Sequence, residues 1–140
     1  MFDLDAEIIP GVSAAGITLG QPIAPVLRFR QPDAIEQRIG VRVLKYGAVW
    51  LFEPDGEGVV SQVCIFAGYR GKVSGSIGIG SRICEIEAAF GSLEHIMGNE
   101  YQIDRGTPWL NNDWCFTLEK GSPSMGEPGW GEARIDCICT

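Results

Sequence analysis

The chain has 140 residues, and 11 basic against 18 acidic side chains give it a formal net charge of −7. This length and a hydrophobic fraction of 45% predict one folded domain over residues 1–140 and exclude a disordered chain. The surplus of carboxylates argues against a general nucleic-acid binder, which needs excess Lys and Arg to neutralise phosphate, and it favours encounter with a basic protein surface.

Strand patterns dominate the first half of the chain. Residues 40–46 alternate apolar and basic side chains, which is typical of a half-buried strand. Residues 48–52 and 59–66 are rich in β-forming side chains, and the Pro-Asp-Gly sequence at 54–56 is a tight-turn signal because Pro presets φ and Gly accepts positive φ. Three consecutive strands with short turns predict an antiparallel meander.

The second half combines a short helix with further strands. The apolar residues between 81 and 90 recur at helical spacing, Ser81 suits the N-cap, and Gly91 suits a left-handed stop. These features predict an amphipathic helix over residues 81–90. Further strands are predicted at residues 100–103, 114–118 and 133–139.

Two segments of the chain match each other position by position. Residues 16–26 align with residues 76–86, and both consist of an apolar-x-apolar-Gly sequence followed by a helical turn. The predicted fold class is therefore α+β, with two related helix-plus-antiparallel-strand units, at 13–66 and 73–139, forming a mainly antiparallel sheet with two short helices. One sheet with both helices on one face satisfies this pattern, and so do two small sheets.

The cysteines indicate a reducing compartment. Their odd number, their wide spacing and the acidic N-terminal sequence predict five free thiols in a cytoplasmic protein. No apolar run approaches the roughly 18 residues of a membrane span. With one histidine and no Cys-x-x-Cys pair, neither a metal site nor a cofactor is expected. The cysteines are Cys64, Cys84, Cys115, Cys137 and Cys139.

Catalytic motifs are incomplete, and the protein is predicted not to be an enzyme. The Gly-rich residues 68–80 follow neither phosphate-loop nor dinucleotide spacing, because Lys72 lies well before the helix. Their glycines are interpreted as turn residues. His95 has no evident acid or metal partner and is interpreted as a surface residue, whereas Cys84 is interpreted as a packing residue.

Tryptophans in two loops are the candidate partner-binding residues. Residues 106–112 and the Gly- and Pro-rich residues 121–131 are predicted loops, whereas Trp114 is predicted to lie in the core. Exposed tryptophans often anchor protein interfaces, and replacing a loop tryptophan by Ala should leave folding nearly intact. Neighbouring carboxylates would speed association with a basic partner. The candidate residues are Trp109, Trp130, Asp104, Asp113, Glu127 and Glu132.

A structural motif in the middle of the chain carries a resemblance to known families. The segment 69–91 contains Tyr69-Arg70-Gly71-Lys72-Val73, then Ile77-Gly78-Ile79-Gly80 and the predicted helix. It resembles small cytosolic immunity proteins of bacterial polymorphic and contact-dependent toxin systems. The tandem layout of helix and strands is also similar to the β-lactamase inhibitor protein family, in which two repeats present loops and a concave sheet to an enzyme. That family is secreted with disulfides, so this chain departs from it, and the resemblance over residues 40–118 transfers no functional residues.

The predicted function is that of an immunity protein, which binds a cognate bacterial toxin and neutralises it by occluding its active site. The charge of −7 suits a basic toxin such as a nuclease, and the protein is expected to be a monomer or a homodimer. One alternative is a small-ligand-binding protein or enzyme that uses the concave sheet, with Arg42, Tyr46 and Glu119 among its polar groups. Another is a structural assembly subunit.

Overall fold

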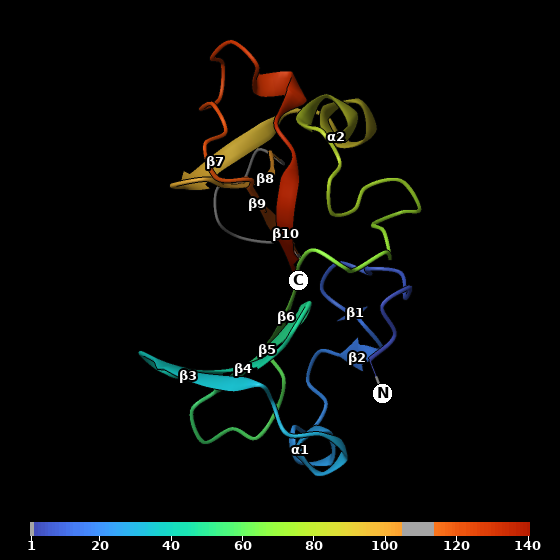
Figure 1. The fold of residues 1–140 in the computed structure, drawn as a ribbon, viewed down its shortest axis with the longest axis vertical. Helices are drawn as coiled ribbons and strands as arrows, with labels where there is room; N and C mark the ends of the chain where they lie inside the picture. Colours follow the sequence, from blue (N-terminus) through green and yellow to red (C-terminus); the bar gives the residue numbers. More distant parts are fainter. Residues whose placement is uncertain (1, 105–113) are drawn as a thin grey trace.

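One curved antiparallel sheet forms the centre of the molecule (Figure 1). The computed structural model describes residues 2–104 and 114–140. Within them, eight strands are hydrogen-bonded in the order β3-β4-β5-β6-β10-β9-β8-β7, and β1 and β2 form a separate hairpin. Together with two short helices in the same residues, this confirms the predicted α+β class and the mainly antiparallel sheet. Of the two arrangements that the sequence left open, the molecule has the single sheet.

Figure 1 labels the elements in chain order. The strands are β1 (Ser13–Ala14), β2 (Ile17–Thr18), β3 (Ala34–Arg38), β4 (Val41–Tyr46), β5 (Val49–Pro54), β6 (Gln62–Ile65), β7 (Leu93–Met97), β8 (Glu100–Ile103), β9 (Cys115–Leu118) and β10 (Ile135–Cys139). The helices are α1 (Ala24–Phe29), α2 (Ile83–Phe90) and the 3-10 helix η1 (Trp130–Glu132). None of the helices in the described residues has the length and apolar character needed to span a bilayer.

The sheet consists of two consecutive four-stranded meanders, β3 to β6 and β7 to β10. They meet where β6 pairs with β10, and Ile65 lies opposite Ile138 at this seam. A helix precedes each meander in the chain. Both helices and the N-terminal segment lie on the outer, convex side of the curved sheet (Figure 1).

The hydrophobic core lies between the convex face of the sheet and the two helices. Val26 of α1 and Ile86 of α2 are fully buried there with sheet residues such as Leu44 and Leu51. Burial of an aliphatic side chain of this size stabilises the fold by about 1.5–3 kcal/mol. Trp114 is 3% exposed, which confirms its predicted place in the core.

The segments that lead into the two helices make equivalent backbone hydrogen bonds. The N–H of Gly20 donates to the carbonyl of Val60 at 2.7 Å, and the N–H of Gly80 donates to the carbonyl of Ile135 at 2.8 Å. Both glycines have positive φ angles, of +90° and +87°, which side-chain-bearing residues rarely adopt. The segment before α1 is thus hydrogen-bonded to the chain just before β6, and the segment before α2 is hydrogen-bonded to the first residue of β10. In both cases the partner is the last strand of the same meander or the residues just before it.

Helix α2 begins one residue later than Ser81 would place it. The N-cap is Arg82, whose N–H donates to the Glu85 carboxylate at 3.0 Å in a capping-box arrangement. Ser81 instead accepts a hydrogen bond from the N–H of Gly78, so its prediction as N-cap is wrong. Gly91 is the C-cap and has a positive φ of 88°, so the helix ends where predicted, but its ψ of −156° lies outside the left-handed helical region that was expected.

A disulfide joins the two meanders at their seam and corrects the prediction of five free thiols. Cys64 of β6 and Cys139 of β10 are directly opposite in the sheet, with a Cα–Cα distance of 4.0 Å, although 75 positions separate them in the chain. Among the free cysteines, Cys137 is buried, Cys115 is half-buried, and Cys84 is exposed rather than packed as predicted. The argument from free thiols to a cytoplasmic location therefore loses its basis.

Candidate functional site: the concave face of the sheet

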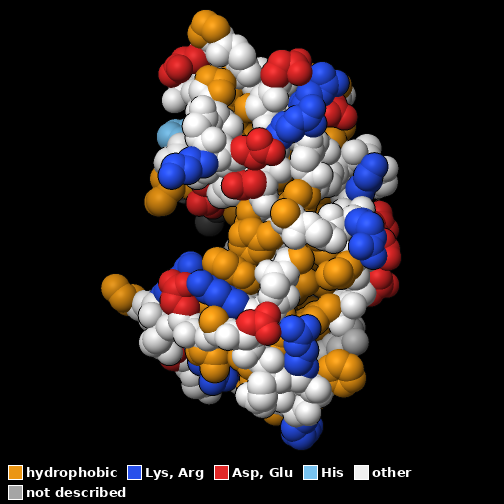
Figure 2. All heavy atoms as spheres, viewed as in Figure 1, with side chains coloured by type: hydrophobic (Ala, Val, Ile, Leu, Met, Phe, Trp, Pro, Cys, Tyr) orange, Lys and Arg blue, Asp and Glu red, His pale blue; other side chains and the backbone are white. Residues whose placement is uncertain are grey.

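The concave face of the sheet is the candidate site, and the strand register defines it. Five residues on successive strands lie directly opposite one another and so share this face: Lys45, Trp50, Cys64, Cys139 and Cys115. The alternate positions on the same strands point into the core beneath the helices. Figure 2 shows the concave face as a hollow between the two halves of the molecule, with apolar side chains at its centre.

Two aromatic rings covered by cations occupy the first meander's part of this face. Lys45 Nζ lies 4.1 Å from the centroid of the Trp50 ring, and the Arg38 guanidinium carbon lies 5.6 Å from that of Phe52. Glu36 connects the two cations through contacts of 2.7 Å to each. Hydrogen bonds from Arg38 and then from Lys45 lower the pKa of Glu36 from 4.5 to about 2. We call these five residues the aromatic–cation patch.

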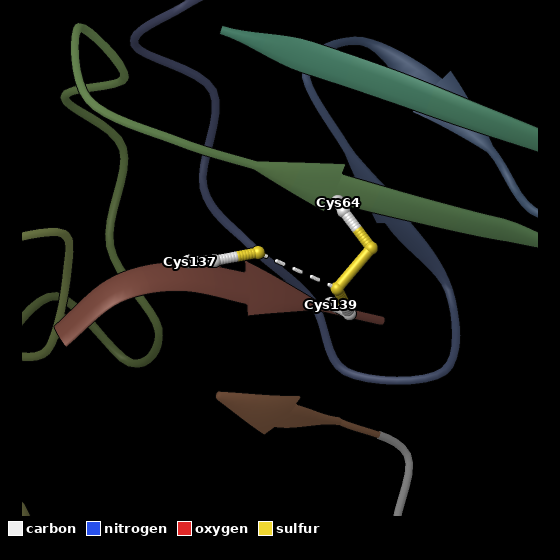
Figure 3. A group of neighbouring side chains, drawn as sticks. All are labelled: Cys64, Cys137 and Cys139. Carbon is white, nitrogen blue, oxygen red and sulfur yellow. Dashed lines mark hydrogen bonds between the residues drawn. A yellow bond between two sulfur atoms is a disulfide. The ribbon is translucent and has the colours of Figure 1, made fainter. Parts of the chain in front are cut away.

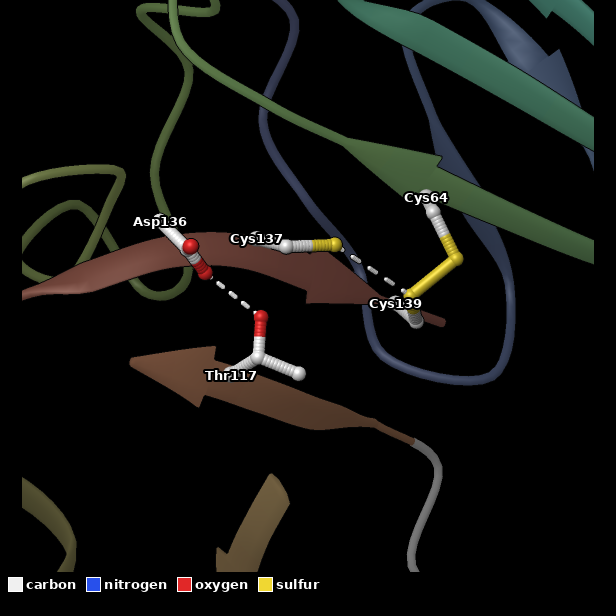
Figure 4. The surroundings of a disulfide bond; sticks show 5 residues. All are labelled: Cys64, Thr117, Asp136, Cys137 and Cys139. Carbon is white, nitrogen blue, oxygen red and sulfur yellow. Dashed lines mark hydrogen bonds between the residues drawn. A yellow bond between two sulfur atoms is a disulfide. The ribbon is translucent and has the colours of Figure 1, made fainter. Parts of the chain in front are cut away.

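Three cysteine sulfur atoms meet at the centre of the face (Figure 3). The thiol of Cys137 lies 3.6 Å from the Sγ of Cys139, which is bonded to Cys64. Burial raises the pKa of Cys137 to about 12, so this thiol is protonated at neutral pH and is a poor nucleophile. Beside it, the hydroxyl of Thr117 donates to the carboxylate of Asp136 at 2.5 Å (Figure 4).

Polar side chains dominate the second meander's part of the face. Burial, and then a hydrogen bond to the Glu100 carboxylate, raise the pKa of Cys115 to about 12. Gln102 is 6% exposed, and its side-chain amide donates to the Glu94 carboxylate at 2.9 Å. This part of the face is therefore acidic and hydrogen-bonding, in contrast to the aromatic–cation patch across the seam.

A cleft of about 540 Å³ opens where these elements meet. The side chains of Gln62, Glu100 and Gln102 line it, together with Cys115 and Cys139. Its volume lies within the range of roughly 300–1,000 Å³ that is usual for small-molecule sites. Its lining combines two amides, one carboxylate and sulfur atoms with the hydroxyls of Ser61 and Thr140, and its apolar residues are Leu19, Ile96 and Trp114.

The partner-binding residues predicted in the second loop lie away from the concave face. Trp130 stands in η1, half-buried, and its ring centroid is 4.9 Å from that of Tyr101 in the core. Glu132 follows it and pairs with Arg82 at the start of α2, at 3.1 Å. Glu127 is exposed, and its carbonyl accepts the Trp130 N–H. These three predicted residues share one segment beside α2.

Of the remaining predicted residues, the structure describes Asp104 alone. Asp104 follows β8, and its N–H donates to the carbonyl of Ser92 at 2.9 Å. Trp109 and Asp113 lie outside the described residues, as does the predicted loop 106–112. His95 is an exposed residue of β7, which agrees with its interpretation as a surface residue, and its Nε2 lies 2.9 Å from the Gly98 carbonyl.

Two of the three polar groups proposed for a ligand on the concave sheet lie on its convex face. Tyr46 is buried in the core on the convex side, where its hydroxyl donates to the Arg30 carbonyl at 3.1 Å. Arg42 lies four residues earlier on the same strand face and is held by Glu53 at 2.5 Å. Glu119 is exposed beyond the end of β9. The alternation of apolar and basic side chains within 40–46 does not follow the two faces of the strand, because Arg42 shares the convex face with Leu44 and Tyr46 whereas Lys45 lies on the concave face.

Three of the five residues of the aromatic–cation patch could be placed on one face from the sequence pattern alone. Lys45, Trp50 and Phe52 occupy alternating positions in the two predicted strands at 40–46 and 48–52, so they share a face once the turn between them is fixed. Glu36 and Arg38 could not be placed on this face from the sequence, because their strand, β3, was not predicted. The meeting of Cys64 with Cys139 depends on a pairing between distant strands, which no local pattern encodes.

Comparisons with known proteins give no further guidance. No family model, no curated protein and no solved structure matches the chain. The resemblance to immunity and β-lactamase inhibitor proteins therefore stays an expectation from the sequence, and the function must be argued from the geometry of the concave face.

Proposed function

We propose that the protein is an immunity protein that receives a cognate bacterial toxin on its concave face and occludes the toxin's active site. The observation that carries the proposal is the concave face itself, which neither helix of the described residues covers. In the described part of the chain both helices pack on the convex side, whereas the other face presents half-buried aromatic rings. Large side chains left half-buried on an open, hollowed face are typical of a protein-binding surface.

The aromatic–cation patch supplies the anchors for such a partner. Trp50 packs against Phe66 at a centroid distance of 4.5 Å, and Lys45 Nζ also contacts its ring, 4.1 Å from the centroid. A tryptophan that is already rigid loses little conformational entropy on binding, so more of its contact energy contributes to affinity. Aromatic side chains in this position are frequent hot spots of protein interfaces.

The charge of the face favours a basic partner. Glu94 and Glu100 lie in the second meander's part of the hollow, and no salt bridge to either is found among the described residues. The whole chain carries −7, which attracts a cationic surface over a distance of about one Debye length. A nuclease-type toxin holds nucleic acid in a cationic cleft, and an acidic hollow would compete for that cleft.

The proposal includes two related structural units that build the face together. The equivalent hydrogen bonds of Gly20 and Gly80, and the matching order of helix and strands in each half, support a duplication of residues 13–66 and 73–139. Each unit ends with the strand that lies at the seam. The aromatic anchors come from the first unit, and most of the acidic groups come from the second.

Surface plasmon resonance against the protein encoded beside this one tests the proposal. Trp50→Ala should weaken binding by about 2 kcal/mol, which is roughly a 30-fold rise in Kd. Phe29→Ala is the matched control, because Phe29 is 63% exposed on α1, on the opposite side of the molecule. Circular dichroism checks the folding of both variants. The proposal would be contradicted if the protein encoded beside this one did not bind. It would also be contradicted if the parent and Trp50→Ala bound that protein equally well.

The cleft supports a second candidate, a small polar ligand. Gln62, Gln102 and Glu100 place two amides and one carboxylate around a volume of about 540 Å³. Such a lining suits a ligand with several hydrogen-bond donors. A thermal-shift screen of polar metabolites against the parent and Gln62→Ala would distinguish this role, because a true ligand raises the Tm of the parent alone.

A further inference from the structure

Three cysteine sulfur atoms lie close together at the centre of the concave face, and the proposed partner binding does not involve them. These atoms, those of Cys64, Cys137 and Cys139, all lie within 4.8 Å of one another (Figure 3). We propose that, once the disulfide is reduced, these three cysteines bind one Cu(I) ion. The proposal is independent of the proposed function.

The backbone holds the three sulfur atoms together whether or not the disulfide is present. Cys64 and Cys139 are register partners on the paired central strands, and Cys137 lies two residues before Cys139 on the same face. Cys64 and Cys137 are only 2% and 6% exposed. Ligands that project from hydrogen-bonded strands in the middle of a sheet are more precisely placed than ligands on loops. Reduction therefore leaves three thiols converged on one point.

The ligand set selects a soft ion of low coordination number. Within the described residues the group contains three sulfur atoms and neither an imidazole nor a carboxylate. Thiolates select Cu(I), Zn²⁺ and iron–sulfur clusters, and the clusters are held by four cysteines. Structural Zn²⁺ almost always takes four ligands. Cys115, the neighbouring thiol on this face, lies outside the group, and its thiol is engaged by the Glu100 carboxylate.

Loading the site requires a balanced change of redox state. A dithiol reductant transfers two electrons and two protons to the Cys64–Cys139 disulfide and is itself oxidised to a disulfide. Cu(I) then displaces the protons of the thiols that bind it, and its own oxidation state does not change. The ion can approach from the concave side, because Cys139 lines the cleft.

The test is an anaerobic titration of the reduced, full-length chain. Cu(I), maintained with ascorbate, competes against a chromophoric Cu(I) chelator of known affinity, and X-ray absorption counts the sulfur ligands. One Cu(I) per chain with three sulfur neighbours is expected. The oxidised parent should bind at least tenfold more weakly, because its disulfide occupies two of the three sulfur atoms. Equal binding by the oxidised and reduced chains would overturn the proposal.

Cysteine variants locate the site within the reduced protein. Cys137→Ser should lower the affinity by more than the roughly tenfold to 100-fold that is usual for loss of a second-sphere group. Cys84→Ser is the matched control, because Cys84 is exposed on α2 and should have no effect. An unchanged affinity in Cys137→Ser overturns the proposal. So does an equal loss in Cys115→Ser, which would mean a four-sulfur site.

Discussion

The side chain of Trp130 illustrates how packing changes the role that a residue can play. Its place in a Gly- and Pro-rich segment predicts a partly exposed interface anchor, and the side chain is indeed half-buried. In the structure its ring packs against Tyr101, which in turn contacts Phe116 at a centroid distance of 6.3 Å. Trp130 thus joins the core cluster from its edge.

We expect Trp130→Ala to destabilise the protein, contrary to the expectation from the sequence. A half-buried tryptophan should cost about 2 kcal/mol, somewhat less than the 3–5 kcal/mol of a fully buried one. Urea unfolding followed by fluorescence measures the change. Met125→Ala, in the same segment and 42% exposed in the parent, is the control and should be nearly neutral. Equal stability of the two variants would show that the ring contributes no packing.

Glu36 should confer a pH dependence on the aromatic–cation patch. Its pKa in the folded chain is about 2, against 4.5 for the free side chain, because Arg38 and Lys45 donate hydrogen bonds to it. A lowered folded-state pKa stabilises the fold above pH 4.5, and this contribution is lost as the pH falls toward 2. Carboxyl NMR should find a midpoint near pH 2, and Glu36→Gln should flatten the acid destabilisation in that interval. A midpoint near 4.5 would mean that the three side chains do not interact in solution.

At the scale of elements, the sequence predicts interior strands better than edge strands. Six strands of the sheet and α2 agree with their predicted positions to within a few residues, because one of their faces is apolar. β3 and β7 were not predicted: they form the two edges of the sheet, and β3 carries Glu36, Gln37 and Arg38 in sequence. Polar edges protect a sheet from pairing with other chains, and they remove the alternation that predicts a strand.

The seam between the meanders should depend measurably on its disulfide. Cross-linking residues 75 positions apart restricts the unfolded chain and typically stabilises a fold by about 2–4 kcal/mol. The double variant Cys64→Ser/Cys139→Ser should lose about this much in urea unfolding, whereas Cys84→Ser should not. Thiol titration of the unfolded, unreduced parent should find three thiols. A count of five would mean that the bridge is absent in solution.

The turns before the two helices should respond alike to the same substitution. Gly20→Ala and Gly80→Ala each force a side chain into a positive-φ conformation, at a cost of about 1–2 kcal/mol. Gly131→Ala is the control, because its Cβ would meet only an ordinary contact of 3.7 Å with Cys84. Unfolding curves that show a loss at one turn and none at the other would weaken the case for a duplication.

At the scale of the whole molecule, net charge should govern how fast a basic partner arrives. Salt screens the attraction of a chain with charge −7, so we expect the association rate to fall several-fold between about 50 and 300 mM salt. Stopped-flow measurements with the co-encoded protein give this dependence. Glu94→Gln, on the concave face, should reduce the rate more than Glu87→Gln on α2. A rate that does not change with salt would exclude electrostatic steering.

The order of the strands also determines when the protein can finish folding. Among the eight strands of the sheet, β10 comes last in sequence order, yet it occupies an interior position between β6 and β9. While the chain emerges from the ribosome, β6 is an open strand edge in the middle of the future sheet, and it stays open until residues 135–139 have been synthesised. Such a non-local closing step is slow and leaves intermediates that are prone to aggregate. Ribosome-bound chains that stop before β10 should therefore be the species that need chaperones.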